Sequence, residues 1–221
     1  MMKLALQALL GAMFLLVSAC SGGTDTPLFV DAVDYDAMDI EGGCPGESAG
    51  AIYRACIDTE TLYTAALASA KESGAPLMVV WGFNECPYCK VFDGENFNPD
   101  KPWKTSDFIK KLTPQQRAAM SKEEKDTFQI SVVRLHARTP NGLAFADKLG
   151  VTDLARERGW GRVWSPFIMV VDPETGKIHT EEKWNAQWSF CESASEFIVN
   201  LVAIGALPDD GDHVWQMCPS A

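Results

Sequence analysis

LMVVWGFNECPYCK, residues 77–90, is the stretch of the sequence that decides the fold. Its first part, residues 77–81, is a short continuous apolar run, which is typical of a strand that is buried on both faces. Two cysteines, Cys86 and Cys89, follow where this strand ends, and Pro87 suits the first position of a helix. The sequence therefore predicts a pair of thiols at the junction between a buried strand and a helix.

The spacing of the two cysteines suits thiol–disulfide exchange. This chemistry needs one thiolate that attacks a disulfide and a second thiol that resolves the mixed disulfide. A free cysteine has a pKa of roughly 8.5, and the unpaired N–H groups and dipole of a helix N-terminus lower it. Cys86 is nearer to the expected helix start, so we predict that Cys86 is the nucleophile and Cys89 the resolving thiol. The neighbouring Lys90 is expected to point into solvent.

Two other interpretations of the Cys86–Cys89 pair are weaker. A structural disulfide that closes so short a loop stabilises little, because the entropic gain grows with loop length. A metal site needs further ligands at tetrahedral spacing, but there is no second Cys-x-x-Cys pair, and His136, His179 and His213 are scattered. We therefore expect a redox pair, no metal site, and no cofactor other than the disulfide itself.

Helical segments are expected on both sides of this stretch. Thr59–Ser73 has an apolar stripe and ends at Gly74, whereas Asp93-Gly94 is expected to interrupt the helix after the cysteines early. Residues 94–127 are expected to form an insertion with three helical pieces: Thr105–Leu112, one that begins at Pro114, and one whose Ser121 and Glu124 have capping-box spacing.

The second half of the chain continues the alternation of strands and helices. The expected elements are a strand over Phe128–Leu135, a helix over Asn141–Leu149, a charged connection over residues 152–164, a hairpin over residues 167–180, and a last helix that Ser193 caps and Gly205 ends. Ser165-Pro166 stands directly before the hairpin. This order places the chain in the α/β class.

The order of elements, the Cys-Pro-Tyr-Cys motif and Ser165-Pro166 together resemble the thioredoxin fold over roughly residues 60–205. The resemblance implies a central mixed β-sheet flanked by helices, with the insertion after the Cys-x-x-Cys helix. It also implies that Pro166 is cis and faces the dithiol, and that Ser165 offers its backbone to the substrate. Pro87 and Tyr88 complete the substrate-binding residues implied in this way. The same motif is common in glutaredoxins and in some periplasmic isomerase-type proteins.

The sequence departs from the thioredoxin pattern in three places. Thioredoxins carry a buried Asp six residues before the first cysteine, where this chain has Val80. They usually have Trp directly before that cysteine, where this chain has Glu85, which is expected to be a solvated carboxylate. The third departure is the insertion at 94–127. The loss of the Asp puts fast proton transfer of the thioredoxin kind in doubt.

The N-terminus resembles that of an exported bacterial lipoprotein. Residues 1–19 have a charged start, an apolar stretch too short to span a bilayer, and small residues before a cleavage point. Residues 16–20 resemble a lipobox, in which Cys20 is acylated; a plain secretory signal with an incidental cysteine is the alternative. The resemblance also implies the outer membrane rather than the inner, because Ser21 and not Asp follows Cys20. The expected domains are a signal peptide at 1–19, a tether and irregular extension at 20–58, a thioredoxin-like domain at 59–207 and a tail at 208–221.

Export determines how the other cysteines are interpreted. Outside the cytoplasm thiols pair into disulfides, and six of the seven cysteines remain if Cys20 carries lipid. Besides the dithiol these are the candidates for structural disulfides: Cys44, Cys56, Cys191 and Cys218. Local closure favours pairing the first two and the last two, while a cross-pairing that ties the two extensions together stays open.

The charge of the chain limits its partners. The net charge of −11 repels nucleic acid phosphates, and no cluster of Lys and Arg opposes this, so we expect no nucleic acid partner. The expected function is an envelope enzyme that faces the periplasm and reduces or isomerises disulfides of envelope proteins. Its expected partners are those proteins, a membrane electron donor of the disulfide-reducing type, and the membrane itself through the lipid anchor. A non-catalytic docking scaffold and a metal chaperone are the alternatives.

Overall fold

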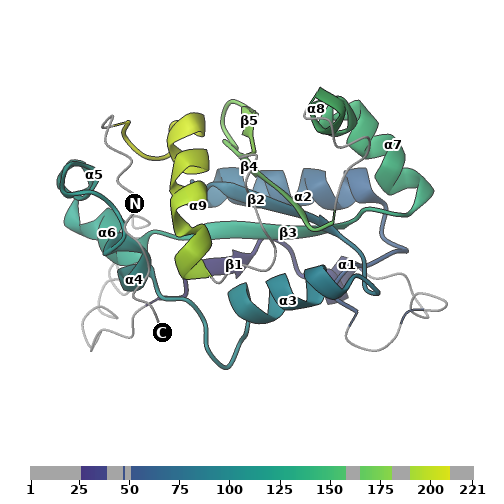
Figure 1. Cartoon of the computed structure of the whole chain (residues 1–221), viewed down its shortest axis with the longest axis horizontal. Coiled ribbons are helices and arrows are strands. Elements are labelled where there is room, and N and C mark those ends of the chain that lie inside the picture. The colour runs from purple at the N-terminus through teal and green to yellow at the C-terminus, as the bar shows by residue number, and fades with distance from the viewer. Residues whose placement is uncertain (1–25, 39–46, 48–50, 158–164, 181–189, 210–221) are drawn as a thin grey trace, which may run out of the picture.

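The computed structural model describes residues 26–38, 47, 51–157, 165–180 and 190–209 (Figure 1). The predicted signal peptide, Cys20 and most of the predicted tail lie outside these residues. Among the described helices, none is both long and apolar enough to cross a bilayer.

The described strands form one mixed sheet in the order β1-β3-β2-β4-β5. β1, β3 and β2 run parallel, β4 runs antiparallel to β2, and β5 runs antiparallel to β4. The bounds of the strands are β1 Phe29–Asp31, β2 Leu77–Gly82, β3 Ile130–His136, β4 Phe167–Val171 and β5 Ile178–His179. The predicted mixed sheet is therefore confirmed.

Helices cover both faces of this sheet. One face packs against α2 (Thr59–Ser73), α7 (Pro140–Lys148) and α8 (Val151–Glu157). The other packs against α3 (Pro87–Asn96), α9 (Phe190–Ile204) and α4 (Thr105–Ile109), the first helix of the insertion. The insertion continues with α5 (Pro114–Ala119) and α6 (Lys122–Thr127). In Figure 1, α9 crosses in front of the strands and α2 runs behind them.

The central strand β2 explains why its sequence is apolar without interruption. Every residue of β2 is buried. Met78 and Val80 belong to the core on the α3 side, whereas Val79 and Trp81 belong to the core on the α2 side. Successive side chains of a strand point to opposite faces, so a strand covered on both sides carries no polar alternation.

Two helix-end signals that the sequence predicted, Gly74 after α2 and the capping box at Ser121, are present, and the structure adds two further caps. Asp58 caps α2 by accepting a hydrogen bond from the Thr61 N–H, and Gly74 ends α2 at a φ of 69°, in the left-handed region. The predicted capping box at Ser121 is present at the start of α6. A second capping box, formed by Thr113 and Gln116, starts α5.

The N-terminal extension is more regular than expected. Residues 28–58 were predicted to be irregular, but β1 joins the sheet and α1 (Tyr35–Met38) follows it. The main chain of β3 holds β1: the Ala32 N–H donates to Val132 O at 2.8 Å, and the Ile130 N–H donates to Leu28 O at 2.8 Å. A three-residue edge strand is too short to show a period of its own, which is why the sequence pattern missed it.

Two further predictions of helix extent were wrong. α3 continues through Asp93-Gly94 to Asn96, because the Asp93 side chain bonds to partners outside the helix instead of competing for its backbone. The charged connection predicted over 152–164 contains α8, in which Val151 and Ala155, four residues apart, are buried. Val151 belongs to the core on the α2 side.

Candidate functional site

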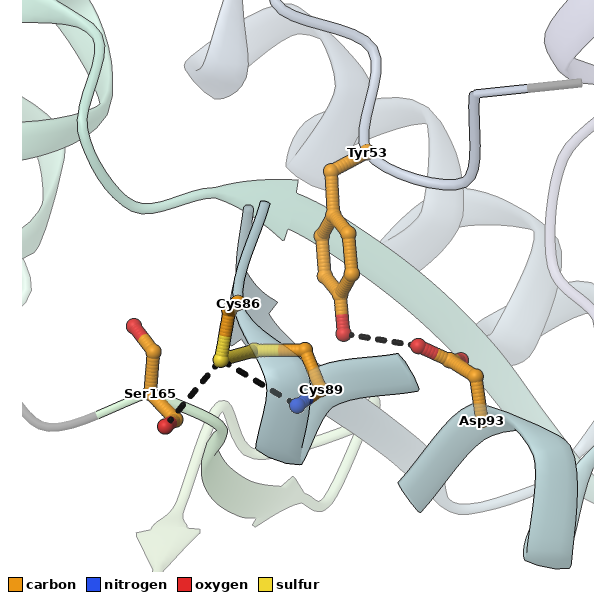
Figure 2. The surroundings of a disulfide bond; sticks show 5 residues. All are labelled: Tyr53, Cys86, Cys89, Asp93 and Ser165. Atoms are coloured by element: carbon orange, nitrogen blue, oxygen red, sulfur yellow. Dashed lines mark hydrogen bonds between the residues drawn. A yellow bond between two sulfur atoms is a disulfide. The ribbon is translucent and has the colours of Figure 1, made fainter. Parts of the chain in front are cut away.

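The dithiol lies at the N-terminus of α3, as predicted. Cys86 is the N-cap residue and Pro87 follows at the first helical position. Cys86 and Cys89 form a disulfide with their Cα atoms 5.2 Å apart. The Cys89 N–H donates to Cys86 Sγ at 3.1 Å, so a backbone dipole already points at this sulfur (Figure 2). In the reduced state the same N–H stabilises a thiolate on Cys86.

The predicted substrate-binding pair lies against the dithiol. The Ser165–Pro166 peptide bond is cis, as predicted. The Ser165 carbonyl oxygen lies 3.5 Å from Cys86 Sγ, although 79 residues separate the two in the chain. Pro87 and Tyr88 are exposed at the start of α3, and Tyr88 is 50% exposed. The fold thus brings Ser165 and Pro166 to the same end of α3 as Pro87 and Tyr88.

A buried polar network that the sequence analysis missed lies one turn further along α3. The Tyr53 hydroxyl donates to Asp93 Oδ2 at 2.9 Å, and Arg134 Nε donates to Asp93 Oδ1 at 2.8 Å. Arg134 also forms an ion pair with Asp31, and its backbone N–H donates to the Tyr35 hydroxyl at 2.8 Å. The residues of this network come from α3, β3 and the N-terminal extension, so no local sequence motif predicts the network.

Burial sets the ionisation of this network. Desolvation raises the pKa of Asp93, although the positive charge of Arg134 opposes the shift. Burial also raises the pKa of Tyr53, and the nearby Asp93 carboxylate adds to the shift. Tyr53 therefore stays a hydroxyl and hydrogen-bond donor at neutral pH, whereas Asp93 holds a proton more readily than an exposed carboxylate does.

The strand-to-helix loop positions Tyr53 over the dithiol segment. Asn84 Oδ1 accepts from the N–H groups of Ile52 and Tyr53 at 3.1 and 3.0 Å, and its Nδ2 donates to Tyr53 O at 2.8 Å. The Tyr53 ring lies so close to Gly82 that a Cβ there would be 2.3 Å from Tyr53 Cζ. Tyr53 belongs to the same packed core as Cys86 and Cys89.

The structure also shows the surroundings of the two positions, 80 and 85, at which the sequence departs from the thioredoxin pattern. Val80 is buried on the α3 side of the sheet, and its register partner in β3 is Arg134. Glu85 and Lys90 are exposed, as predicted. His136, at the end of β3, is half-buried, and burial lowers its pKa despite the opposing charge of Glu85. In the part of the chain that the structure describes, no cluster of three or more His, Cys, Asp or Glu side chains is arranged to hold a metal ion.

One of the candidate structural cysteines is in a disulfide, whereas the pairing of all four remains a prediction. Cys56 is disulfide-bonded. Its predicted partner Cys44 lies outside the described residues, as does Cys218. Cys191 lies in α9, but its side chain is also outside the described part.

A family model and solved structures of other proteins are similar to parts of this chain. The model of a family described as thioredoxin-like matches residues 58–109, which include β2 and the dithiol. Similar solved structures include a disulphide isomerase from Xylella fastidiosa Temecula1, with 19% identity over 63% of this chain and 82% of that chain and a TM-score of 0.34. They also include a thioredoxin from Thermus thermophilus, with 21% identity over 65% of this chain and 87% of that chain and a TM-score of 0.36. No curated protein matches the sequence. The predicted fold class, a thioredoxin-like fold with a mixed sheet between helices, is confirmed.

Proposed function

We propose that this chain, which carries a thioredoxin-like domain, is a thiol–disulfide oxidoreductase of the bacterial cell envelope. It reduces or isomerises disulfides in exported proteins, and of these two activities we favour reduction. Lipid on Cys20 anchors it, it faces the periplasm, and a membrane partner supplies its electrons. The observation that supports the activity best is the Cys86–Cys89 pair, which lies at a helix N-terminus and against the Ser165 carbonyl.

The geometry supports a two-step exchange. The Cys86 thiolate attacks one sulfur of a substrate disulfide, forming a mixed disulfide and releasing the first substrate thiolate. The Cys89 thiolate then attacks Cys86 Sγ, which releases the second substrate thiolate and re-forms the Cys86–Cys89 bond. Two electrons pass to the substrate, and the membrane donor restores them by the reverse exchange.

The surface beside the dithiol suits a protein substrate. Tyr88 and Val91 on α3 are 50% and 44% exposed, and Ile52 is 37% exposed beside Asn84. These are three of the five large exposed apolar side chains in the described residues. Tyr88 is two residues from Cys86 in the chain, and an exposed aromatic side chain there favours an unfolded or extended chain over a small charged disulfide.

The test of this function is the midpoint potential of the Cys86/Cys89 pair, measured on residues 21–221 in graded thiol buffers. A value near that of thioredoxin, roughly −270 mV, supports a reductase, and a value nearer roughly −120 mV supports an oxidant. Cys86→Ser is expected to abolish turnover of a protein disulfide. Cys89→Ser is expected to keep the first attack and to accumulate the mixed disulfide. Wild-type turnover by Cys86→Ser contradicts the proposal.

One observation favours a docking scaffold instead. Cys86 and Cys89 are only 2% and 0% exposed. A dithiol that stays inaccessible after reduction reacts slowly with alkylating reagents, as expected of a scaffold whose disulfide only stabilises it. Rapid alkylation of Cys86 in the reduced protein, with slow alkylation of Cys89, supports the enzyme; equally slow alkylation of both supports the scaffold.

A further inference from the structure

The resolving step needs a proton acceptor that the dithiol itself does not supply. Cys89 must lose its proton before it attacks Cys86 Sγ, because the thiolate is the nucleophile. Cys89 is 0% exposed, so bulk water does not reach it directly. The side chain of Val80 on β2 has no acid group, and the Glu85 carboxylate beside Cys86 is exposed. The acceptor therefore has to come from another element.

Asp93 is positioned to act as the proton acceptor for Cys89. It follows Cys89 by four residues, so the two side chains lie on the same face of α3. Both residues are buried, with Asp93 6% exposed. Hydrogen bonds from Tyr53 and Arg134 occupy one position on each carboxylate oxygen, and each oxygen can accept a second. Tyr53 packs in the same core as Cys86 and Cys89, and in the view of Figure 2 its hydroxyl points past the disulfide to the Asp93 carboxylate, to which it is bonded.

We propose that Tyr53 and Asp93 form the proton relay of the resolving step. The Tyr53 hydroxyl takes the proton from Cys89 Sγ as it passes its own proton to Asp93 Oδ2. The S–H bond of Cys89 breaks, an O–H bond forms on Asp93, and the resulting thiolate attacks Cys86 Sγ. After the substrate thiolate leaves, Asp93 returns the proton to it. This inference rests on the proposed oxidoreductase function.

The charges around Arg134 make Asp93 a suitable acceptor. The guanidinium of Arg134 contacts two carboxylates, those of Asp93 and Asp31, so the cluster has a net charge of −1 when both are ionised. A proton on Asp93 makes the cluster neutral while Asp31 still balances Arg134. Burial favours the neutral cluster, and it raises the pKa of Asp93 accordingly. A base whose pKa lies closer to the working pH transfers protons more efficiently.

The N-terminal extension is then part of the active site. Tyr53 and Asp31 both precede the first helix of the thioredoxin-like domain, and Asn84 fixes the Tyr53 main chain beside the dithiol. Gly82 gives the Tyr53 ring room to lie directly on β2. The hydroxyl is therefore held by its backbone, its ring and its bond to Asp93, which is the preorganisation that a relay needs.

The relay is tested by separating the two chemical steps. The reduced full-length chain is mixed rapidly with dithiobis(nitrobenzoate), and release of the coloured thiol is followed over time. Attack by Cys86 releases the first equivalent, and resolution by Cys89 releases the second. The variants are Asp93→Asn and Tyr53→Phe, and the matched control is Asp100→Asn, which removes an exposed carboxylate of the insertion. Both phases are recorded as a function of pH.

In the wild type the second phase is expected to be fast and only weakly dependent on pH near neutrality. Asp93→Asn is expected to slow this phase about 100-fold at neutral pH, the lower end of the usual contribution of a general base. Its rate should then rise tenfold per pH unit, because only preformed thiolate reacts. Tyr53→Phe should slow the second phase in the same way. The first phase and the Asp100→Asn control should keep wild-type rates.

The outcomes distinguish the relay from the function on which it rests. If the wild type shows no first phase, the oxidoreductase proposal fails and the relay fails with it. If both phases occur but Tyr53→Phe keeps the wild-type rate and pH profile of the second, the relay is overturned and the enzyme stands. Should Asp93→Asn not fold, Tyr53→Phe decides alone, since it removes one hydroxyl and no charge. A purely structural role would slow both phases equally and leave the pH profile unchanged.

Discussion

Replacing Gly82 with Ala tests how tightly the N-terminal extension is packed on the dithiol segment. A Cβ at this position would lie 2.3 Å from Tyr53 Cζ and 2.6 Å from its hydroxyl oxygen. The ring cannot move away cheaply, because Tyr53 is 1% exposed and its hydroxyl is bonded to Asp93. Overpacking costs about 1–3 kcal/mol. A lost hydrogen bond to a charged group costs about 1.5–3 kcal/mol.

Gly82→Ala is therefore expected to lower the free energy of unfolding by about 2.5–6 kcal/mol, the sum of these two costs. Urea denaturation of the oxidised protein measures the change. The matched control is Gly94→Ala, where a new Cβ meets nothing within 4 Å inside α3. It should stabilise the protein by up to about 1 kcal/mol, the difference in helix propensity between Gly and Ala.

A double-mutant cycle assigns the cost to the Tyr53 ring. In a Tyr53→Ala background the space beside Gly82 is open, so Gly82→Ala should cost less than about 1 kcal/mol there, and the difference is the coupling energy. The reasoning is refuted if Gly82→Ala and Gly94→Ala change stability equally. It is also refuted if the cost of Gly82→Ala persists without the ring.

Two further predictions concern residues around the dithiol. Asn84→Ala removes three hydrogen bonds to the main chain of Ile52 and Tyr53, so it should cost about 3 kcal/mol in urea denaturation at roughly 1 kcal/mol per bond. Asn98→Ala is the control and should cost less than half as much, because within the described residues the Asn98 side chain accepts one hydrogen bond, from the Asp100 N–H. Burial lowers the pKa of His136 in the folded state, and its Nδ1 accepts from the Arg138 N–H, so the folded state prefers the neutral ring. Stability should therefore fall as the pH drops below the unfolded value of about 6.5. His136→Gln should remove this decline between about pH 7 and pH 5, and an unchanged pH profile of unfolding would contradict it.

The sequence was sufficient for the elements with strong local signals. β2 is continuously apolar because helices cover both of its faces, so its pattern directly predicted a central strand. Gly74 ends α2 and the Ser121 capping box starts α6, as the sequence predicted. β1 and α8 were missed for opposite reasons. β1 has only three residues and is held by the main chain of β3, so its side chains show no pattern. α8 has only two buried positions, four residues apart, among charged residues, so its apolar stripe is too narrow to recognise.

The site was predictable only where its chemistry is local in sequence. The spacing of Cys86, Pro87 and Cys89 predicted the dithiol, and the resemblance to the thioredoxin fold implied the role of Pro166 before the hairpin. Asp93, Tyr53 and Arg134 lie about 40 residues or more from one another along the chain. Asp93 even misled the prediction, because Asp-Gly is a turn signal in isolation and the tertiary hydrogen bonds that keep it helical are invisible in sequence.

Position 80, which has no acid, and position 93, which has one, both lie next to Arg134. Val80 and Arg134 are register partners on the face of the sheet beneath α3, so an Asp at 80 would sit next to the guanidinium on the strand. In this chain the carboxylate is that of Asp93 on α3. It accepts hydrogen bonds from Arg134 on β3 and from the Tyr53 hydroxyl. From the N-terminal extension, Tyr53 bonds to this buried carboxylate and Asp31 pairs with Arg134. The extension is therefore expected to govern the redox site, because without Tyr53 and Asp31 the pair of Asp93 and Arg134 would face solvent.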